Sequence, residues 1–167
     1  MIIGLAAFFV VLTVAGLGVR LYMGRSAEDR LRSGEDIAIS ALRGPLAQNA
    51  ALAAPAGYCA VDQAMPSPVF AMSLDRLAGY WTEIIAGEPR IIQIAAEPDR
   101  RRLVLIQRSA VFGFPDVITV EFVSLAPDRS SLALYSRARY GRSDFGVNRR
   151  RLERWLSQLR QIAGAAD

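Results

Sequence analysis

Histidine and lysine are both missing from the 167-residue chain, so all twenty basic residues are arginine. Histidine is the commonest general base and a frequent metal ligand. Its absence excludes catalytic triads and zinc sites that contain histidine. The single cysteine, Cys59, can form neither an internal disulfide nor a thiolate cluster, and we interpret it as a small apolar filler. We therefore expect no metal, no cofactor and a protein that is not an enzyme.

Acidic residues are scarce in the second half of the chain. Residues 1–83 contain six arginines and seven acids, whereas residues 84–167 contain fourteen arginines and nine acids. An excess of five positive charges attracts anionic lipid, acidic proteins or nucleic acid. Neither an aromatic platform nor a known nucleic-acid motif accompanies these arginines, so we expect no nucleic-acid partner.

A long charge-free run stands at the start of the sequence. Residues 2–19 carry no charge, and continuing to residue 23 gives about 22 residues, roughly 33 Å as a helix, which matches a bilayer core. No basic segment precedes the run and no A-x-A cleavage site follows it, which favours a retained anchor over a signal peptide. The sequence predicts a transmembrane helix over residues 1–23, contacting lipid through residues 2–23, and a single-pass protein of the bacterial inner membrane.

The orientation in the membrane is weakly indicated by charge. Arg20, Arg25, Arg30 and Arg32 flank the C-terminal end of the apolar run. Because basic residues tend to stay on the cytoplasmic side, this pattern favours a cytoplasmic domain. The rule has exceptions, so the side of the membrane stays open.

The rest of the chain divides into a tether and a domain. Residues 24–48 are polar and charged, and we interpret them as a tether. The domain then spans residues 49–163. Its first part, residues 49–70, has several prolines and no sustained periodicity, so we expect irregular structure there. Ser73 then precedes apolar residues at helical spacing, which predicts a helix that ends near Gly87.

Four strand-like segments follow that helix. They are rich in β-branched, leucine and aromatic residues and cover residues 90–95, 103–109, 117–124 and 131–140. An amphipathic pattern over residues 148–163 predicts a final helix. The expected fold is α+β, with a small antiparallel sheet of about four strands packed by two helices, the last at the C-terminus.

Two motifs stand out in the second half of the chain. One is QRS at residues 107–109 followed by FGFPD at 112–116; the other is SRARYGRSDFGVNR at 136–149. Together they resemble the bacterial and plastid family known as domain of unknown function 1499, over roughly residues 49–160. Ala138 departs from the family pattern, which usually has serine there. The resemblance implies a membrane-associated or exported domain of unassigned activity and supplies no catalytic residues.

These motifs have a structural interpretation. Asp144 or Asn148 would cap the final helix, and Arg137 and Arg139 would pair with the carboxylates of Asp116 and Asp144. Ser136 belongs to the same network. In this interpretation the motifs fix the geometry of the fold and bind nothing.

A binding interpretation is also open. Arg108, Arg137, Arg139 and Arg142, with Asn148, would converge near the N-terminus of the final helix and bind a phosphate, a carboxylate or a partner there. In a third interpretation, Asp116 and Asp144 form the carboxylate pair of a histidine-independent hydrolase. Neighbouring arginines would lower both pKa values and weaken an acid role.

The sequence thus favours a membrane-anchored, non-catalytic accessory or binding module of unassigned activity, acting through contacts with other membrane proteins. The alternative is a lipid or small-anion binder with its site near the N-terminus of the final helix.

Overall fold

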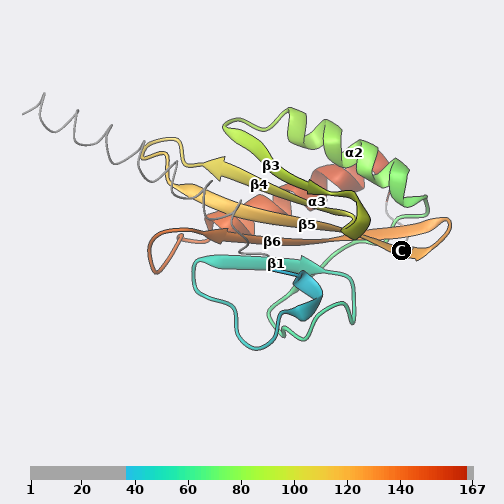
Figure 1. The fold of residues 1–167 in the computed structure, drawn as a ribbon, viewed down its shortest axis with the longest axis horizontal. Coiled ribbons are helices and arrows are strands. Elements are labelled where there is room, and N and C mark those ends of the chain that lie inside the picture. Colours follow the sequence, from blue (N-terminus) through green and yellow to red (C-terminus); the bar gives the residue numbers. More distant parts are fainter. Residues whose placement is uncertain (1–36, 165–167) are drawn as a thin grey trace, which may run out of the picture.

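The computed structural model describes residues 37–164 of the chain (Figure 1). The predicted anchor, residues 2–23, lies outside the described residues. Within residues 37–164, no helix is both long enough and apolar enough to cross a bilayer.

A single six-stranded sheet forms the centre of the domain, in the order β2-β1-β6-β5-β4-β3. All neighbouring strands are antiparallel except β1 and β2, which are parallel. The prediction of a small antiparallel sheet of about four strands is therefore wrong, because the sheet is larger and mixed. The strands are β1 (Ala50–Ala54), β2 (Met65–Pro66), β3 (Ile91–Glu97), β4 (Arg102–Arg108), β5 (Pro115–Ala126) and β6 (Arg129–Ala138).

The two unpredicted strands have little local signal. β1 is four alanines and one leucine, and alanine is depleted in strands. Its backbone hydrogen bonds come from a strand distant in sequence, because Ala51 pairs with Ser136 of β6. β2 is only two residues long, and its Pro66 is tolerated because the strand lies at the edge of the sheet. Long-range pairing, which no local pattern encodes, makes these segments strands.

Two helices cover one face of the sheet. Helix α2 (Leu74–Ala86) begins after Ser73, whose hydroxyl accepts a hydrogen bond from the Arg76 N–H at 3.4 Å. Helix α3 (Val147–Ala163) closes the fold. The indole rings of Trp81 and Trp155 meet edge to face, with centroids 5.5 Å apart and planes at 88°, at the contact between the helices. Both indoles are fully buried with the leucine and isoleucine side chains of the inner strands.

The opposite face of the sheet is covered by the short 3-10 helix η1 (Ile39–Ala41) and the segment after β1. Glu121 of β5 is buried on this side and accepts hydrogen bonds from the Ile39 N–H at 3.0 Å and the Tyr58 hydroxyl at 2.8 Å. Burial, together with this bond to a carboxylate, raises the pKa of Tyr58. These contacts tie residues 39–58 to the sheet. A second 3-10 helix, η2 (Pro98–Arg100), joins β3 to β4.

Candidate functional site

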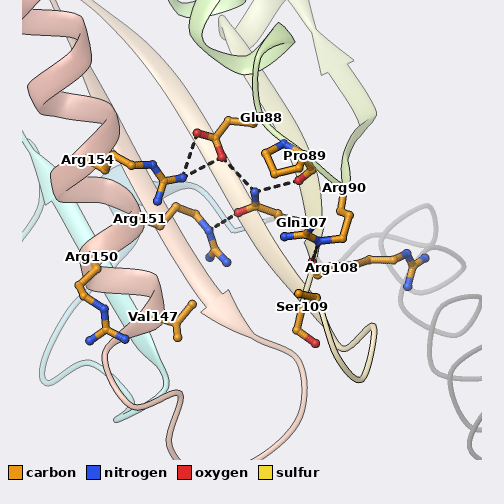
Figure 2. Close-up of a pocket in the computed structure, with 11 residues that line it drawn as sticks. Glu88, Pro89, Arg90, Gln107, Arg108, Ser109, Val147, Arg150, Arg151 and Arg154 are labelled. Carbon is orange, nitrogen blue, oxygen red and sulfur yellow. Dashed lines mark hydrogen bonds and ion pairs between the residues drawn. The ribbon is translucent and has the colours of Figure 1, made fainter.

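A cleft of about 520 Å³ opens between α3 and the sheet edge formed by β3 and β4 (Figure 2). Five arginines and one glutamate line it, so its charge is strongly positive. Figure 2 shows residues of α3 on one wall, and residues of the turn before β3 and of the end of β4 on the other. The full lining is Glu88, Pro89, Arg90, Gln107, Arg108, Ser109, Ala110, Val147, Arg150, Arg151 and Arg154.

Helical spacing places the arginines of the first wall. Arg150 and Arg154 are four residues apart on α3, so they lie on the same side of the helix, one turn apart. On the second wall, Arg90 follows the turn after α2, and its Nε donates to the Arg108 carbonyl at 3.1 Å. Arg90 takes a positive φ of 57° there. The two walls thus bring guanidinium groups from distant parts of the sequence to one opening.

Arg151 lies at the base of this cleft and is 6% exposed. Its Nη2 donates to Asp116 Oδ2 at 2.6 Å and its Nε to Gln107 Oε1 at 2.5 Å. Its Nη1 donates to Ser136 Oγ at 2.9 Å and to Asn148 Oδ1. Arg151 therefore joins α3 to the three adjacent strands β4, β5 and β6. A guanidinium with its donors satisfied in this way holds the helix in register with the sheet.

Asp116 is buried against this guanidinium. Desolvation raises the pKa of its carboxyl, the nearby Asp144 adds to that effect, and the attraction of Arg151 only partly opposes it. Arg151 is thus the group that favours the ionised form of this carboxyl. We interpret Asp116 as the counter-ion of Arg151.

Glu88 lines the cleft beside Arg154 and Gln107 (Figure 2). Both of its carboxylate oxygens accept from Arg154 Nη2, at 2.9 and 2.8 Å, and Gln107 Nε2 donates to Oε2 at 3.1 Å. Burial alone would raise the pKa of Glu88, but these hydrogen bonds and the Arg154 charge outweigh it and lower the pKa. Glu88 and Arg154 therefore largely neutralise each other, so this pair adds little to the net positive charge of the cleft.

The N-terminus of α3 is capped from within the chain. Asp144 Oδ1 accepts from the Gly146 N–H at 3.0 Å, and Oδ2 accepts from the Asn148 N–H at 2.6 Å. Asn148 is fully buried, and its side-chain amide donates to the Asn49 carbonyl at 3.1 Å. The carboxylate of Asp144 already occupies the position where the sequence interpretation placed an external anion.

The structure separates the arginines that sequence reasoning had grouped together. Arg108 lines the cleft, but Arg137, Arg139 and Arg142 are not among its lining residues in the described part of the chain. Strand alternation explains Arg137, which lies on the face of β6 that carries Ala133 and Tyr135, away from α3. The guanidinium that binds Asp116 belongs to Arg151, whereas sequence reasoning assigned Arg137 and Arg139 to the carboxylates.

Other predicted residues do come together. Ser136 Oγ donates to Asn148 Oδ1 at 2.5 Å, and both contact Arg151 beside Asp116. The residues that sequence reasoning missed are Glu88, Arg90, Arg150, Arg151 and Arg154. Arg151 had a signal in the sequence, because it lies three residues after Asn148 and four before Trp155 and thus beside the buried side of the helix.

The model of the family described as protein of unknown function (DUF1499) matches residues 60–159, well over half of the chain. The chain belongs to the DUF1499 family. The resemblance inferred from the two motifs is thus confirmed. No curated protein matches the chain.

The DUF1499 match covers every residue that lines the cleft and supplies no evidence for a catalytic activity. Within the network of Arg151, only Asn49 lies before the matched region. The cleft is therefore a feature of the DUF1499 domain itself.

Replacing Asp144 with alanine should destabilise the DUF1499 domain by about 0.5–2 kcal/mol, the usual cost of losing a helix cap. The variant leaves the Gly146 and Asn148 N–H groups without their acceptor. Urea unfolding of the full chain in non-ionic detergent measures the difference. Asp128→Ala, in the exposed β5–β6 turn, is the matched control and should change stability by less than about 0.5 kcal/mol. Equal stability of Asp144→Ala and wild type would contradict the capping role.

Proposed function

We propose that this DUF1499 protein is a membrane-associated, non-catalytic binding module that takes a phosphate or carboxylate group in the arginine-lined cleft. The observation that carries the proposal is the composition of the cleft, in which five arginines face one glutamate. A guanidinium binds such oxyanions through two parallel hydrogen bonds, which gives both affinity and orientation.

The number of N–H donors on Arg90 and Arg150 supports anion binding. A guanidinium has five N–H donors. Within residues 37–164, Arg150 donates one hydrogen bond, to the Phe145 carbonyl at 2.9 Å, and Arg90 donates one, to the Arg108 carbonyl. Neither forms an ion pair with an acid in this part of the chain. Both therefore have donors and charge to offer an incoming anion.

Three acids in or near the cleft are already engaged. Asp116 is paired with Arg151, and Glu88 is paired with Arg154. Asp144 is bound to the backbone of α3. A hydrolase that uses Asp116 and Asp144 would need carboxylates that can exchange protons with a substrate. The geometry favours binding over that chemistry.

Membrane attachment is the second part of the proposal, and it rests on the sequence. The charge-free residues 2–19 have the length and composition of a bilayer-spanning segment. The flanking arginines favour a domain on the cytoplasmic side of a bacterial inner membrane. Action through contacts with other membrane proteins, the function that the sequence favours, stays a prediction. Recovery of such partners by mild-detergent purification and mass spectrometry would test it.

Anion binding is tested by the melting temperature of the full chain in non-ionic detergent. We expect inorganic phosphate to raise the melting temperature relative to chloride at equal ionic strength. Arg90→Gln combined with Arg150→Gln should remove that increase and leave the phosphate-free melting temperature nearly unchanged, because both side chains are exposed.

Arg160→Gln is the matched control for this experiment. Arg160 is an exposed arginine in the last turn of α3, outside the cleft lining. This variant should keep the response to phosphate. An equal response in the double variant and wild type, or no response in wild type, would overturn the proposed function.

A further inference from the structure

Large apolar side chains are exposed next to the part of the cleft that Ser109 and Val147 line. Phe145 is 87% exposed, Val111 is 74% exposed and Phe112 is 63% exposed. Phe114, in the same loop as Val111 and Phe112, is also exposed, and so is Val147, the first residue of α3. That loop, between β4 and β5, is one segment, and the other, which contains Phe145, joins β6 to α3. Exposed aromatic groups clustered in this way mark an interaction surface.

The two segments form one continuous surface. The rings of Phe112 and Phe114 stack with centroids 5.4 Å apart. Phe114 also contacts Tyr140 of the second segment, with ring centroids 6.3 Å apart. Ser109 and Val147, next in sequence to these groups, line the cleft. The apolar surface therefore borders the cationic cleft directly.

The exposed position of Phe145 is fixed by local structure. Phe145 has a positive φ of 53°, a conformation that bulky residues rarely adopt. The Ser143 hydroxyl accepts from the Phe145 N–H at 3.2 Å, and Arg150 Nη1 binds the Phe145 carbonyl at 2.9 Å. An arginine of the cleft thus holds an exposed phenylalanine in an unfavourable backbone conformation. Strain combined with exposure points to a function for this side chain.

The first loop is also fixed. The Phe114 N–H donates to the Ser109 hydroxyl at 3.0 Å, and the Ser109 N–H donates to the Phe114 carbonyl at 2.9 Å. These bonds close the loop at its base, and Gly113 takes the positive φ of 69° that the turn requires. Val111 and Phe112 consequently form the tip of an ordered loop.

We propose that this end of the domain docks onto an anionic bilayer, with Val111, Phe112 and Phe145 entering the interface while the cleft arginines bind lipid headgroup phosphates. The inference rests on the proposed function and names the source of its anion as the membrane. Charge complementarity favours an anionic bilayer as the partner, because arginines beside a bilayer are attracted to anionic headgroups. Aromatic and aliphatic side chains at protruding loop tips suit the interface between headgroups and acyl chains.

Depth-dependent quenching tests the docking on the full chain reconstituted in vesicles. In a Cys59→Ser background, an environment-sensitive fluorophore is attached to a single cysteine placed by Val111→Cys. The matched reporter is Leu125→Cys, an exposed apolar position at the other end of β5. The 12 residues of β5, from Pro115 to Ala126, put roughly 35 Å between these two ends.

Spin-labelled lipid should quench the fluorophore at position 111 in vesicles that contain phosphatidylglycerol, and less in phosphatidylcholine alone. The fluorophore at position 125 should stay unquenched in both. Phe112→Asp with Phe145→Asp should abolish the quenching at 111, and Arg90→Gln with Arg150→Gln should remove its dependence on phosphatidylglycerol. Equal quenching at both positions, or none at either, would overturn the docking.

The two proposals fail separately. If phosphate stabilises the detergent-solubilised protein but position 111 is not quenched, the docking inference is wrong and the anion site stands. If the fluorophore at 111 shifts its emission without lipid quenching, the surface contacts a protein or a second copy, which also overturns the docking. Quenching at 111 without any phosphate response supports the docking surface and overturns the anion site.

Discussion

Arg151→Met is expected to destabilise the domain by about 3–5 kcal/mol, because it removes one partner of a buried ion pair. The side chain of Asp116 is only 12% exposed and would lose its guanidinium. Gln107, Ser136 and Asn148 would each lose a hydrogen-bond donor in a buried environment. An effect of this size is a large part of the stability of an ordinary domain. Urea unfolding of the full chain in detergent provides the measurement.

The pH dependence of Arg151→Met stability tests whether the unpaired Asp116 carboxylate causes the loss. Burial already raises the pKa of Asp116, and removing Arg151 should raise it further. When the pKa of a carboxyl is higher in the folded state than in the unfolded state, its protonated form stabilises the fold. This stabilisation is present at low pH and is lost as pH rises through the folded-state pKa. Arg151→Met should therefore be least stable near neutral pH and should recover as pH falls toward the ordinary range of aspartate.

Two further variants test this result, one that should restore stability and one that serves as a control. Adding Asp116→Leu to Arg151→Met removes the unpaired charge and should restore part of the lost stability. Arg149→Met is the matched control, because Arg149 is an exposed arginine paired with Glu153 at 2.8 Å. Exposed pairs of this kind contribute at most about 1 kcal/mol. Similar effects for Arg149→Met and Arg151→Met would contradict the central position of Arg151.

Trp155→Ala should also cost about 3–5 kcal/mol, the usual range for removing a large aromatic side chain from a core. Trp155 is fully buried and packs edge to face on Trp81. It lies on α3 between Arg151 and the last turns of the helix, so the same contact places the arginine wall of the cleft. Loss of the indole should weaken both the fold and the phosphate response.

Trp155→Phe tests whether an aromatic contact with Trp81 is what holds α3 to the sheet. A phenyl ring keeps an aromatic contact with Trp81 and fills part of the volume, so this variant should be clearly more stable than Trp155→Ala. The unfolding free energies and the phosphate-induced melting shift are compared in parallel. An equal loss of stability in both variants would show that the aromatic contact is not what holds α3 to the sheet.

The sequence predicted the elements that have strong local signals. The apolar spacing after Ser73 predicted a helix that the structure places at α2, and the stripe containing Leu152 and Trp155 predicted α3. Four strands, β3 to β6, fall within or close to the predicted segments. β1 and β2 were missed because an alanine-rich strand and a two-residue edge strand become strands only by pairing with distant residues.

The site was less predictable, because it depends on which face each arginine occupies. The motif drew attention to Arg137, yet strand alternation places Arg137 away from α3. Arg151 was overlooked among three consecutive arginines, although only this one points to the buried network. The cleft also needs Arg90 and Arg150, which come together only through the register of β3 on β4 and the docking of α3.

Nuclear magnetic resonance of the arginine Nε–Hε groups shows whether Arg90 and Arg150 bind an oxyanion. The full chain in detergent is titrated with inorganic phosphate, and each arginine resonance is assigned by substitution. We expect saturable shifts for Arg90 and Arg150, with Arg160 unchanged. Shifts that are equally small and non-saturating for all three arginines would contradict a phosphate site in the cleft.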